Sequence, residues 1–215
     1  MVGSDKNITT LLFVRWPEAG RVKTRLAGAL GAESACGIYT MLATRAFAEA
    51  MKVAGSQVVV CGTGAMPDAF ARWLPGAFAY WSQPEGGLGE RLAELFTRAF
   101  QSGSDAVLAI GSDAPTLDAA AITHAAAALA SHDVSILPAE DGGYALIGLS
   151  RFPPRLFADM PWSTARLLEA TRERCASEGL TLCIGPTFPD VDTEEDWQRF
   201  SELTEFAGIP RGEQQ

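Results

Sequence analysis

The chain has 215 residues, of which 47% are hydrophobic, and its formal net charge is -9. This length can bury one large core, and the hydrophobic share is typical of a globular protein rather than a disordered one. The acidic excess argues against non-specific binding to nucleic acid, which requires a basic surface. No apolar run approaches the roughly 20 residues of a membrane span, and no secretory signal follows Met1. We therefore expect a cytoplasmic protein.

The cysteines show no spacing typical of a metal site. The four positions are Cys36, Cys61, Cys175 and Cys183, and neither histidine lies near any of them in the sequence. We interpret these cysteines as small core residues of a protein in a reducing compartment. A zinc site is not expected.

Short apolar runs alternate with helical patterns from one end of the chain to the other. Strands are expected at residues 8–15, 57–61, 78–81, 107–110, 134–137, 145–149 and 181–184. Helices are expected at residues 32–54, 67–74, 118–130 and 162–179. A further helix is expected to follow the glycines at residues 86–89 and to end near residue 100, and the last helix is expected from about residue 193 onward. No internal repeat or linker interrupts the pattern. It indicates a single α/β domain over residues 1–207, with a mostly parallel twisted sheet flanked by helices, and a flexible tail at 208–215.

A basic loop follows the first strand directly. Between residues 16 and 26 it carries Gly20, Arg21, Lys23 and Arg25. A glycine lets backbone amides approach an anion closely, and cations in front of a helix neutralise phosphates. The spacing is not that of a Walker loop. We interpret the segment as a phosphate-binding loop, although a solvated basic turn would also explain it.

The stretch at residues 107–117 organises the rest of the chain. Its apolar strand stops at Gly111, and Asp113 is the first carboxylate beyond the strand. Pro115 disfavours a helix at this point, and Thr116 is expected to cap a helix that begins near residue 117. Ligands bind outside the carboxyl ends of strands in open α/β sheets, where Asp113 could hold Mg²⁺ or Mn²⁺ against a diphosphate. A simpler interpretation is that Asp113 only caps the turn.

A glycine-rich segment precedes the helix that ends near residue 100. Gln83, Gly89 and Arg91 belong to this segment, which has three glycines in four residues. The glycines could let the backbone contact a nucleotide base or phosphate, with Arg91 facing the site from the first helical turn. They could equally form a plain turn and helix cap.

Two later segments are candidates for binding an acceptor substrate. Asp141, Gly142, Gly143 and Tyr144 join two apolar strands, and the paired glycines would let a substrate pass close to the backbone while Asp141 contacts its hydroxyl or amino groups. The same residues are an ordinary turn sequence. Trp162 precedes a helix for which Ser163 is a credible N-cap. If Ser163 is the N-cap, Trp162 would serve only as a hydrophobic staple that packs against the first turn of that helix.

Two aspartates precede the last predicted helix. Thr193 and Asp196 match a capping box, which explains both of them. Asp190 and Asp192 lie before that helix and are not explained by it. Together with Asp113 from another strand end, Asp192 could complete a site of oxygen ligands for a divalent cation.

Taken together, these motifs resemble a bacterial family. The order is a basic loop after strand one, Gln-x-x-Gly-Gly-Leu-Gly-x-Arg, Gly-Ser-Asp-x-Pro, Asp-Gly-Gly-Tyr, Trp-Ser-Thr and Asp-x-Asp-Thr-x-x-Asp, over about residues 11–200. It is similar to glycosyltransferase-A-like transferases associated with radical-SAM and selenoprotein gene neighbourhoods. More distantly, it resembles the molybdenum-cofactor guanylyltransferase and the phospholactate guanylyltransferase.

The resemblance implies a glycosyltransferase-A fold, also called the nucleotide-diphospho-sugar transferase fold. It implies that Gly20, Arg21, Lys23 and Arg25 cradle nucleotide phosphates and that Asp113 and Asp192 are metal ligands. The chain departs from these patterns in three places. The guanylyltransferase pattern Leu-x-Gly-Gly-x-Ser-x-Arg-Met is absent after the first strand. Gly87 stands where this family is expected to have an aspartate, and Asp113 is a single acid where glycosyltransferases usually have Asp-x-Asp.

The expected function is a transferase that uses Mg²⁺ or Mn²⁺ and a nucleotide or nucleotide-diphospho-sugar, with Lys23 and Asp113 in catalytic roles. Glycosyl transfer is slightly favoured, and nucleotidyl transfer with release of pyrophosphate is the alternative. A nucleotide-binding module without catalysis is a third reading, motivated by Gly87 and the single acid at Asp113. The sequence leaves the base, the sugar, the acceptor and the oligomeric state open.

Overall fold

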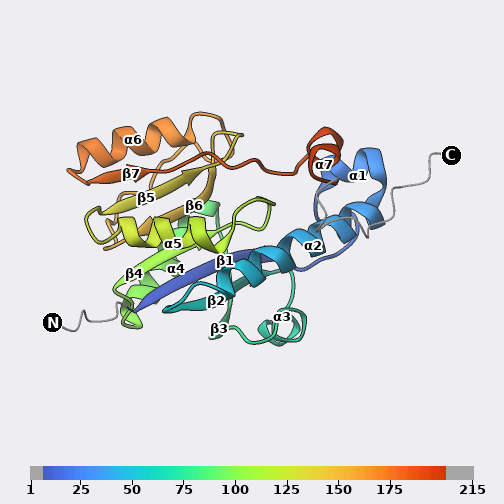
Figure 1. Cartoon of the computed structure of the whole chain (residues 1–215), viewed down its shortest axis with the longest axis horizontal. Helices are drawn as coiled ribbons and strands as arrows, with labels where there is room; N and C mark the ends of the chain where they lie inside the picture. The colour runs from blue at the N-terminus through green and yellow to red at the C-terminus, as the bar shows by residue number, and fades with distance from the viewer. Residues whose placement is uncertain (1–6, 202–215) are drawn as a thin grey trace.

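A seven-stranded sheet of order β3-β2-β1-β4-β6-β5-β7 forms the centre of the protein (Figure 1). The computed structural model describes residues 7–201. The strands are β1 (Ile8–Arg15), β2 (Ser56–Thr63), β3 (Ala79–Ser82), β4 (Ala106–Ile110), β5 (Val134–Pro138), β6 (Tyr144–Leu149) and β7 (Leu182–Ile184). The helices are α1 (Thr24–Leu30), α2 (Ala32–Met51), α3 (Pro67–Trp73), α4 (Leu88–Gln101), α5 (Ala119–Ala128), α6 (Leu167–Ser177) and α7 (Glu194–Ser201). The tail predicted at residues 208–215 lies outside the described residues.

The sheet is mostly parallel, as the sequence predicted. Strands β3, β2, β1 and β4 pair in parallel, and so do β5 and β7. Only β6 is antiparallel, to β4 on one side and β5 on the other. The carboxyl ends of β1, β4 and β5 therefore lie at one edge of the sheet, together with the start of β6. That edge is where the predicted site residues would gather.

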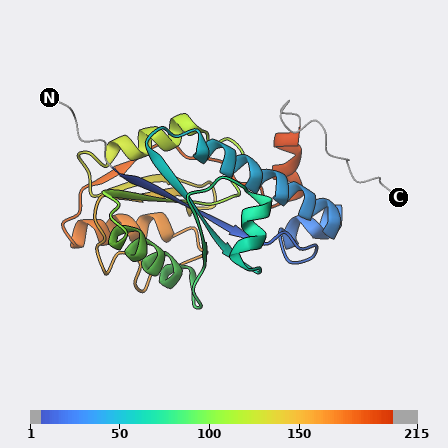
Figure 2. The ribbon, with the colours of Figure 1, turned by 90° about the horizontal axis from the view of Figure 1, so that it is seen from below.

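Helices cover both faces of the sheet because the strands are apolar on both sides. Leu12 of β1 belongs to a core with α2, α3 and α5, whereas its neighbour Leu11 belongs to a core with α4. Figure 2 shows α2 and α5 on one side of the sheet and α4 and α6 on the other. None of the described helices is long and apolar enough to cross a membrane.

A third, smaller core lies beyond the end of β1. It joins Leu26 of α1, Ile38 of α2, the fully buried Val191, and Trp197 of α7. Figure 1 shows α1 and α7 side by side next to the beginning of α2. This core ties the basic loop after β1 to the acidic segment before α7.

Three local expectations were wrong. The cap expected at Thr116 is instead Asp118, whose Oδ1 accepts from Ala121 N at 2.8 Å, and the helix begins at Ala119. The helix expected from residue 162 begins only at Leu167. Ser163 has a φ of 60°, and this left-handed conformation is incompatible with a right-handed helix. The end of the basic loop, from Thr24 onward, already belongs to α1.

Asp133 ties the start of β5 to the segment that leads into β7. Its Oδ2 accepts from Thr181 N and Oγ1 at 2.9 Å each, and its Oδ1 accepts from Arg151 Nε at 2.6 Å. The Arg151 bond, followed by the Thr181 backbone bond, lowers the pKa of Asp133 to about 2. A carboxylate with a lowered pKa contributes stability above its unfolded pKa of 3.8, and this stability is lost as the pH falls through about 2.

Replacing Asp133 by alanine is therefore expected to lower the free energy of unfolding at pH 7 by about 1–2 kcal/mol, because it removes charge-assisted hydrogen bonds. The deficit relative to wild type should shrink as the pH falls from about 4 to 2. Urea denaturation at several pH values measures both effects. The exposed Glu173 of α6 supplies the control variant, Glu173→Ala. A deficit that does not change with pH would contradict this account of Asp133.

Candidate functional site

Three charged side chains from distant parts of the chain meet at the carboxyl edge of the sheet. Lys23 Nζ lies 2.8 Å from Asp113 Oδ1 and 2.8 Å from Asp192 Oδ1. The Lys23 side chain is only 6% exposed, whereas those of Asp113 and Asp192 are 48% and 38% exposed. The structure thus brings the two aspartates proposed from sequence as metal ligands to one point, and the ammonium group of Lys23 lies between them.

The loop after β1 turns sharply before it reaches Lys23. Gly20 has a φ of 78°, which favours glycine, and Arg21 N donates to the Glu18 carbonyl at 2.9 Å. Val22 is buried and anchors the loop in the core. Lys23 itself has a φ of 46° as the N-cap of α1, an uncommon backbone conformation for a residue with a side chain. In this conformation the buried ammonium group of Lys23 pairs with both Asp113 and Asp192.

The segment before α7 is held against the end of β4. Val191 is fully buried, and its amide N donates to the carbonyl of Asp113 at 3.1 Å. Neighbours along an extended segment face the opposite way, so Asp190 and Asp192 are directed away from the core that contains Val191. The amide N of Asp192 donates to Asp196 Oδ2 at 3.0 Å, which continues the expected capping of α7. These contacts place Asp192 beside Asp113.

The charges around Lys23 keep it protonated. Burial lowers the pKa of Lys23, but the charges of Asp113 and Asp192 and their hydrogen bonds outweigh burial, so that the pKa lies above its usual value. The ammonium group thus persists at neutral pH. Because it neutralises part of the charge of both aspartates, any ligand or ion that binds there must compete with it or move it.

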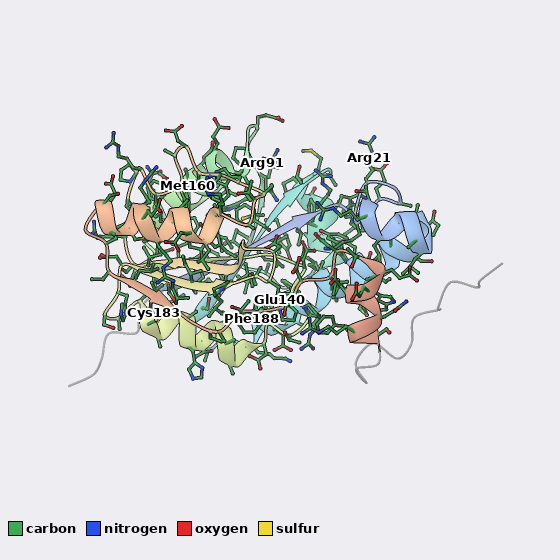
Figure 3. All side chains as sticks on the ribbon, turned by 90° about the horizontal axis from the view of Figure 1, so that it is seen from above. Arg21, Arg91, Glu140, Met160, Cys183 and Phe188 are labelled. Atoms are coloured by element: carbon green, nitrogen blue, oxygen red, sulfur yellow. The ribbon has the colours of Figure 1, made fainter. Side chains whose placement is uncertain are left out.

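The basic loop borders an open cavity of about 330 Å³. Its lining residues are Arg15, Arg21, Val22, Lys23, Thr24, Arg25, Tyr39, Asp113 and Asp192. The side chains of Arg21 and Arg25 are 71% and 78% exposed. Figure 3 shows Arg21 at the outer end of the loop, beside α1. We call this space the basic cavity.

A second cavity, of about 280 Å³, shares Asp113 and Asp192 with the basic cavity. Asp141 and Asp190 add two further carboxylates to its wall, and Trp162 belongs to its aromatic side. We call this space the acidic cavity. It contains the side chains that the sequence analysis assigned to acceptor binding, and Gly143 and Tyr144 line it as well.

Close packing fixes the aromatic wall of the acidic cavity. The rings of Tyr144 and Trp162 meet edge to face, with centroids 6.3 Å apart. The Tyr144 hydroxyl is hydrogen-bonded to Thr171 Oγ1 of α6. Gly89 leaves room for the indole, since a Cβ at this position would come within 2.5 Å of Trp162 Nε1. Gly89 therefore positions Trp162, and its assignment to nucleotide binding stays a prediction.

The Asp-Gly-Gly loop is docked on the beginning of α6. Gly142 has a φ of 87°, and a Cβ there would lie 2.6 Å from Ala165 Cα. Its carbonyl accepts from Leu168 N at 3.1 Å. Asp141 Oδ1 accepts from Gly143 N at 2.7 Å, which holds the carboxylate at the cavity wall. Gly142 is thus required by a close backbone approach, whereas a Cβ at Gly143 would meet the Asp141 carboxylate, with Oδ1 at 3.0 Å.

A backbone contact explains why Asp141 lies near Asp190. Glu140 N donates to the carbonyl of Phe188 at 3.1 Å, and both residues are labelled side by side in Figure 3. The Glu140 carboxylate also pairs with Arg199 Nη1 of α7 at 3.0 Å. The loop after β5 and the segment before α7 therefore run together.

The acidic surroundings change the titration of Asp190. Burial, followed by the charges of Asp141 and Asp192, raises the pKa of Asp190 to about 6. This carboxylate therefore lies in a region of negative potential.

Gln83 and Arg91 contact each other next to the ends of β1 and β2. The Gln83 amide donates to the carbonyls of Val14 and Cys61 at 3.2 and 2.8 Å, and Arg91 Nη1 donates to Gln83 Oε1 at 3.3 Å. Neither side chain lines the basic or the acidic cavity in the described structure. Their assignment to nucleotide binding stays a prediction.

The donor atoms of Asp113 and Asp192 suit a hard divalent cation. Their Oδ1 atoms converge on one point, and the buried Asp113 Oδ1 has no partner other than Lys23 among residues 7–201. Within the same residues, no group of three or more acidic, histidine or cysteine side chains is arranged to hold a metal. Mg²⁺ commonly takes one or two protein carboxylates and completes its shell with water and substrate phosphates. The residues therefore fit such an ion, provided that Lys23 gives up its position.

Sequence reasoning did not assign Arg15 or Tyr39 to the site, although both line the basic cavity. The Tyr39 hydroxyl accepts from Arg15 N at 2.7 Å and donates to Arg15 O at 3.0 Å, at the end of β1. Arg15 could have been inferred from its place at the end of the first strand. Tyr39 could not, because its helical spacing is that of a core residue.

Comparison with known proteins identifies the family of this chain. The sequence profile of the bacterial family DUF2064, described as "Uncharacterized protein conserved in bacteria", matches residues 46–164. The chain belongs to this family. The matched part includes Asp113, the Asp-Gly-Gly loop and Trp162. No curated protein matches the sequence significantly.

Solved structures place the DUF2064 chain in the nucleotide-diphospho-sugar transferase fold. A "putative nucleotide-diphospho-sugar transferase" from Desulfovibrio desulfuricans G20 is 29% identical, with a TM-score of 0.86 over 94% of this chain and 93% of that one. A CMP:2-keto-3-deoxy-manno-octonic acid synthetase complexed with CTP is 12% identical, with a TM-score of 0.61 over 92% of this chain and 98% of that one. Rv0371C from Mycobacterium tuberculosis, in complex with manganese, is 17% identical, with a TM-score of 0.51 over 92% and 100%. The structural neighbours thus include transferases of nucleotides and nucleotide sugars.

Proposed function

We propose that this DUF2064 protein transfers a group from a nucleotide or nucleotide-diphospho-sugar to a small-molecule acceptor. The observation that carries the proposal is the pair of cavities that share Asp113 and Asp192, one bordered by cations and the other by carboxylates. Ligands bind at this edge of open α/β sheets. The basic cavity suits the phosphates of the donor, and the acidic cavity suits the acceptor.

Within the basic cavity, Arg21 pairs with Glu18 at 3.5 Å and Arg25 with Asp192 at 3.6 Å. Because both arginine side chains are largely exposed, these pairs are weak and the side chains can turn toward a diphosphate. Lys23 lies deeper, and phosphate oxygens would replace the aspartates as its partners. Moving the Lys23 ammonium group toward the phosphates would free the Oδ1 atoms of Asp113 and Asp192. A single movement of the Lys23 side chain would thus both pair its ammonium group with the phosphates and make the two aspartates available to a metal ion.

We propose that Asp113 and Asp192 then hold Mg²⁺ or Mn²⁺. The convergence of their oxygens supports this, as does the manganese complex of the structural neighbour Rv0371C. When bound, the ion would supply positive charge for the diphosphate leaving group. The protein's own contribution is to orient the donor with Lys23 and the arginines and to hold the acceptor against the aromatic wall.

Two reactions fit this arrangement. Glycosyl transfer, which we favour, releases a nucleoside diphosphate, and nucleotidyl transfer releases pyrophosphate. We also propose that the protein is related to the guanylyltransferases and to the transferases of radical-SAM gene neighbourhoods. We further propose that it is located in the cytoplasm. A nucleotide-binding module without catalysis is the alternative favoured by Gly87 and by the single acid at Asp113. Analysis of the released product separates all three.

A thermal-shift panel of nucleoside diphosphates, triphosphates and nucleotide sugars, each with Mn²⁺, Mg²⁺ or EDTA, tests the proposal. A donor at a hundred times its dissociation constant should stabilise the protein by about 2.7 kcal/mol and raise Tm by about 5–10 °C. Asp113→Asn should lose the metal-dependent part of the shift, while the control Asp68→Asn, on exposed α3 surface, keeps it. Equal shifts in Mn²⁺ and EDTA would remove the metal from the proposal, and no shift with any nucleotide would contradict the donor assignment.

A further inference from the structure

The acidic cavity has a one-sided set of charges. Its charged lining residues are Asp113, Asp141, Asp190 and Asp192, and no lysine, arginine or histidine among the described residues lines it. Its other polar groups are hydroxyls such as those of Tyr144, Ser163 and Thr164. Hydrogen-bond acceptors therefore dominate the wall.

Two of the four carboxylates have a cation beside them. Lys23 contacts Asp113 and Asp192 from the basic cavity. Asp141 and Asp190 form no ion pair within residues 7–201, and the one side-chain bond of Asp141 comes from the amide N of Gly143. A ligand in the acidic cavity would thus face two carboxylates whose charge is not compensated by the protein.

The shape of the acidic cavity points to a ring-sized ligand. A volume of about 280 Å³ lies just below the usual range of about 300–1,000 Å³ for small-molecule sites. The edge-to-face pair of Trp162 and Tyr144 forms one wall, and Leu88 and Leu92 of α4 add aliphatic surface. One face of a sugar-like ring could lie on this apolar wall while its polar groups reach the aspartates.

On the basis of the proposed function, we infer that the acceptor is a ring-sized molecule that presents hydroxyl or amino groups and carries no phosphate or carboxylate. Hydroxyl and amino groups donate hydrogen bonds to carboxylates, and an amine adds charge attraction. A phosphate or carboxylate would be repelled by Asp141 and Asp190 and would find no lysine, arginine or histidine among the described lining residues, while the ion proposed at Asp113 and Asp192 would be engaged by the donor diphosphate. Asp141 and Asp190 are thus the residues that determine the charge of the acceptor.

Sugar phosphates, which are common acceptors for nucleotidyl transfer, would be repelled from the acidic cavity, and this favours glycosyl transfer to a hydroxyl or amine. The acceptor oxygen or nitrogen forms a bond to the anomeric carbon of the donor. The bond from that carbon to the diphosphate oxygen breaks, its electron pair stays on the nucleoside diphosphate, and the acceptor proton leaves to water.

Ligand-observed NMR with four probes of the same ring tests the inference: glucose, glucosamine, glucuronate and glucose 6-phosphate. Pyrophosphate is present throughout to occupy the basic cavity. Glucosamine and glucose should bind, and the two anionic probes should bind at least tenfold more weakly than glucosamine. In Asp141→Asn/Asp190→Asn this preference should fall at least fivefold. The control Asp68→Asn/Glu173→Gln removes two exposed charges and should keep it.

The variant Trp162→Phe tests whether the probes bind in the acidic cavity, because it keeps an aromatic wall of smaller area. It should lower the affinity for glucose and for glucosamine to the same extent. Anionic probes that bind as well as glucosamine, a preference unchanged in the double variant, or no binding by any probe would each overturn the inference. The nucleotide thermal shift is measured in parallel. If nucleotides fail to bind, the proposed function falls whatever the probes do. If nucleotides bind and the anionic probes win, only the inference falls.

Discussion

Replacing Lys23 by methionine is expected to weaken binding of a nucleoside diphosphate at least tenfold, or about 1.4 kcal/mol. Methionine keeps most of the length of the side chain and removes the ammonium group, the most buried cation of the basic cavity. The loss leaves Asp113 and Asp192 facing each other without their shared cation. Because both carboxylates are more than a third exposed, water screens much of that repulsion, and we expect a stability loss of about 1–2 kcal/mol in EDTA.

Lys52→Met is the matched control for Lys23→Met. Lys52 is 62% exposed and pairs with the buried Glu49 at 2.6 Å, away from the basic cavity, so its loss should leave nucleotide affinity unchanged. Mn²⁺ without nucleotide should raise Tm more in Lys23→Met than in wild type, since the ion no longer competes with the ammonium group. Isothermal titration calorimetry and thermal unfolding measure these effects. Equal nucleotide affinity in Lys23→Met and wild type would remove Lys23 from the phosphate site.

Replacing Gly142 by alanine is expected to cost about 3 kcal/mol of stability. A residue with a side chain is strained at a φ of 87°, which costs about 1–2 kcal/mol. In addition, the new Cβ would lie 2.6 Å from Ala165 Cα and 2.6 Å from its carbonyl oxygen, so the loop and the beginning of α6 must separate. The acidic cavity lies between these segments, so acceptor probes should lose affinity while nucleotide binding persists.

Gly179→Ala separates strain from the close approach. Gly179 also has a positive φ, of 65°, but a Cβ there meets no atom within 4 Å. This variant should lose only about 1 kcal/mol and keep full probe binding. Urea denaturation and the NMR probe assay compare the two variants. Equal stability losses for Gly142→Ala and Gly179→Ala would show that the contact with Ala165 does not matter.

The strand pattern could be predicted from sequence because buried strands are short apolar runs. Residues 8–15 were predicted as the first strand, and β1 has the same bounds. Helix starts were less predictable, since they depend on a few backbone angles. At α6, the left-handed Ser163 delays the helix to Leu167, although its hydroxyl side chain is typical of an N-cap.

The candidate site could be predicted only in part. Asp113 follows β4 and Asp192 precedes α7. Both residues were expected at the same edge of the sheet, so their convergence could be inferred from topology. The position of Lys23 between them could not, because it depends on an unusual backbone conformation held by tertiary contacts. The nearness of Asp141 and Asp190 depends on the contact between Glu140 and Phe188, which lie far apart in the sequence.

The roles of the glycines were also ambiguous in the sequence. Gly89 and Gly142 were both interpreted as positions where the backbone could approach a ligand, with a plain turn as the alternative. In the structure, Gly89 makes room for Trp162 and Gly142 for the backbone of Ala165. A glycine that allows two protein segments to approach has the same sequence signature as one that allows a ligand to approach.

The central claim is that donor phosphates and acceptor occupy different cavities that share Asp113 and Asp192. A crystal structure with Mn²⁺ and the nucleoside diphosphate that gives the largest thermal shift tests this claim most directly. We predict that the phosphates contact Lys23 and Arg25 in the basic cavity, with the Lys23 ammonium group moved off the two aspartates and the acidic cavity still open. Phosphates bound beside Asp141 and Trp162 in the acidic cavity, with the Lys23 bridge intact, would contradict it.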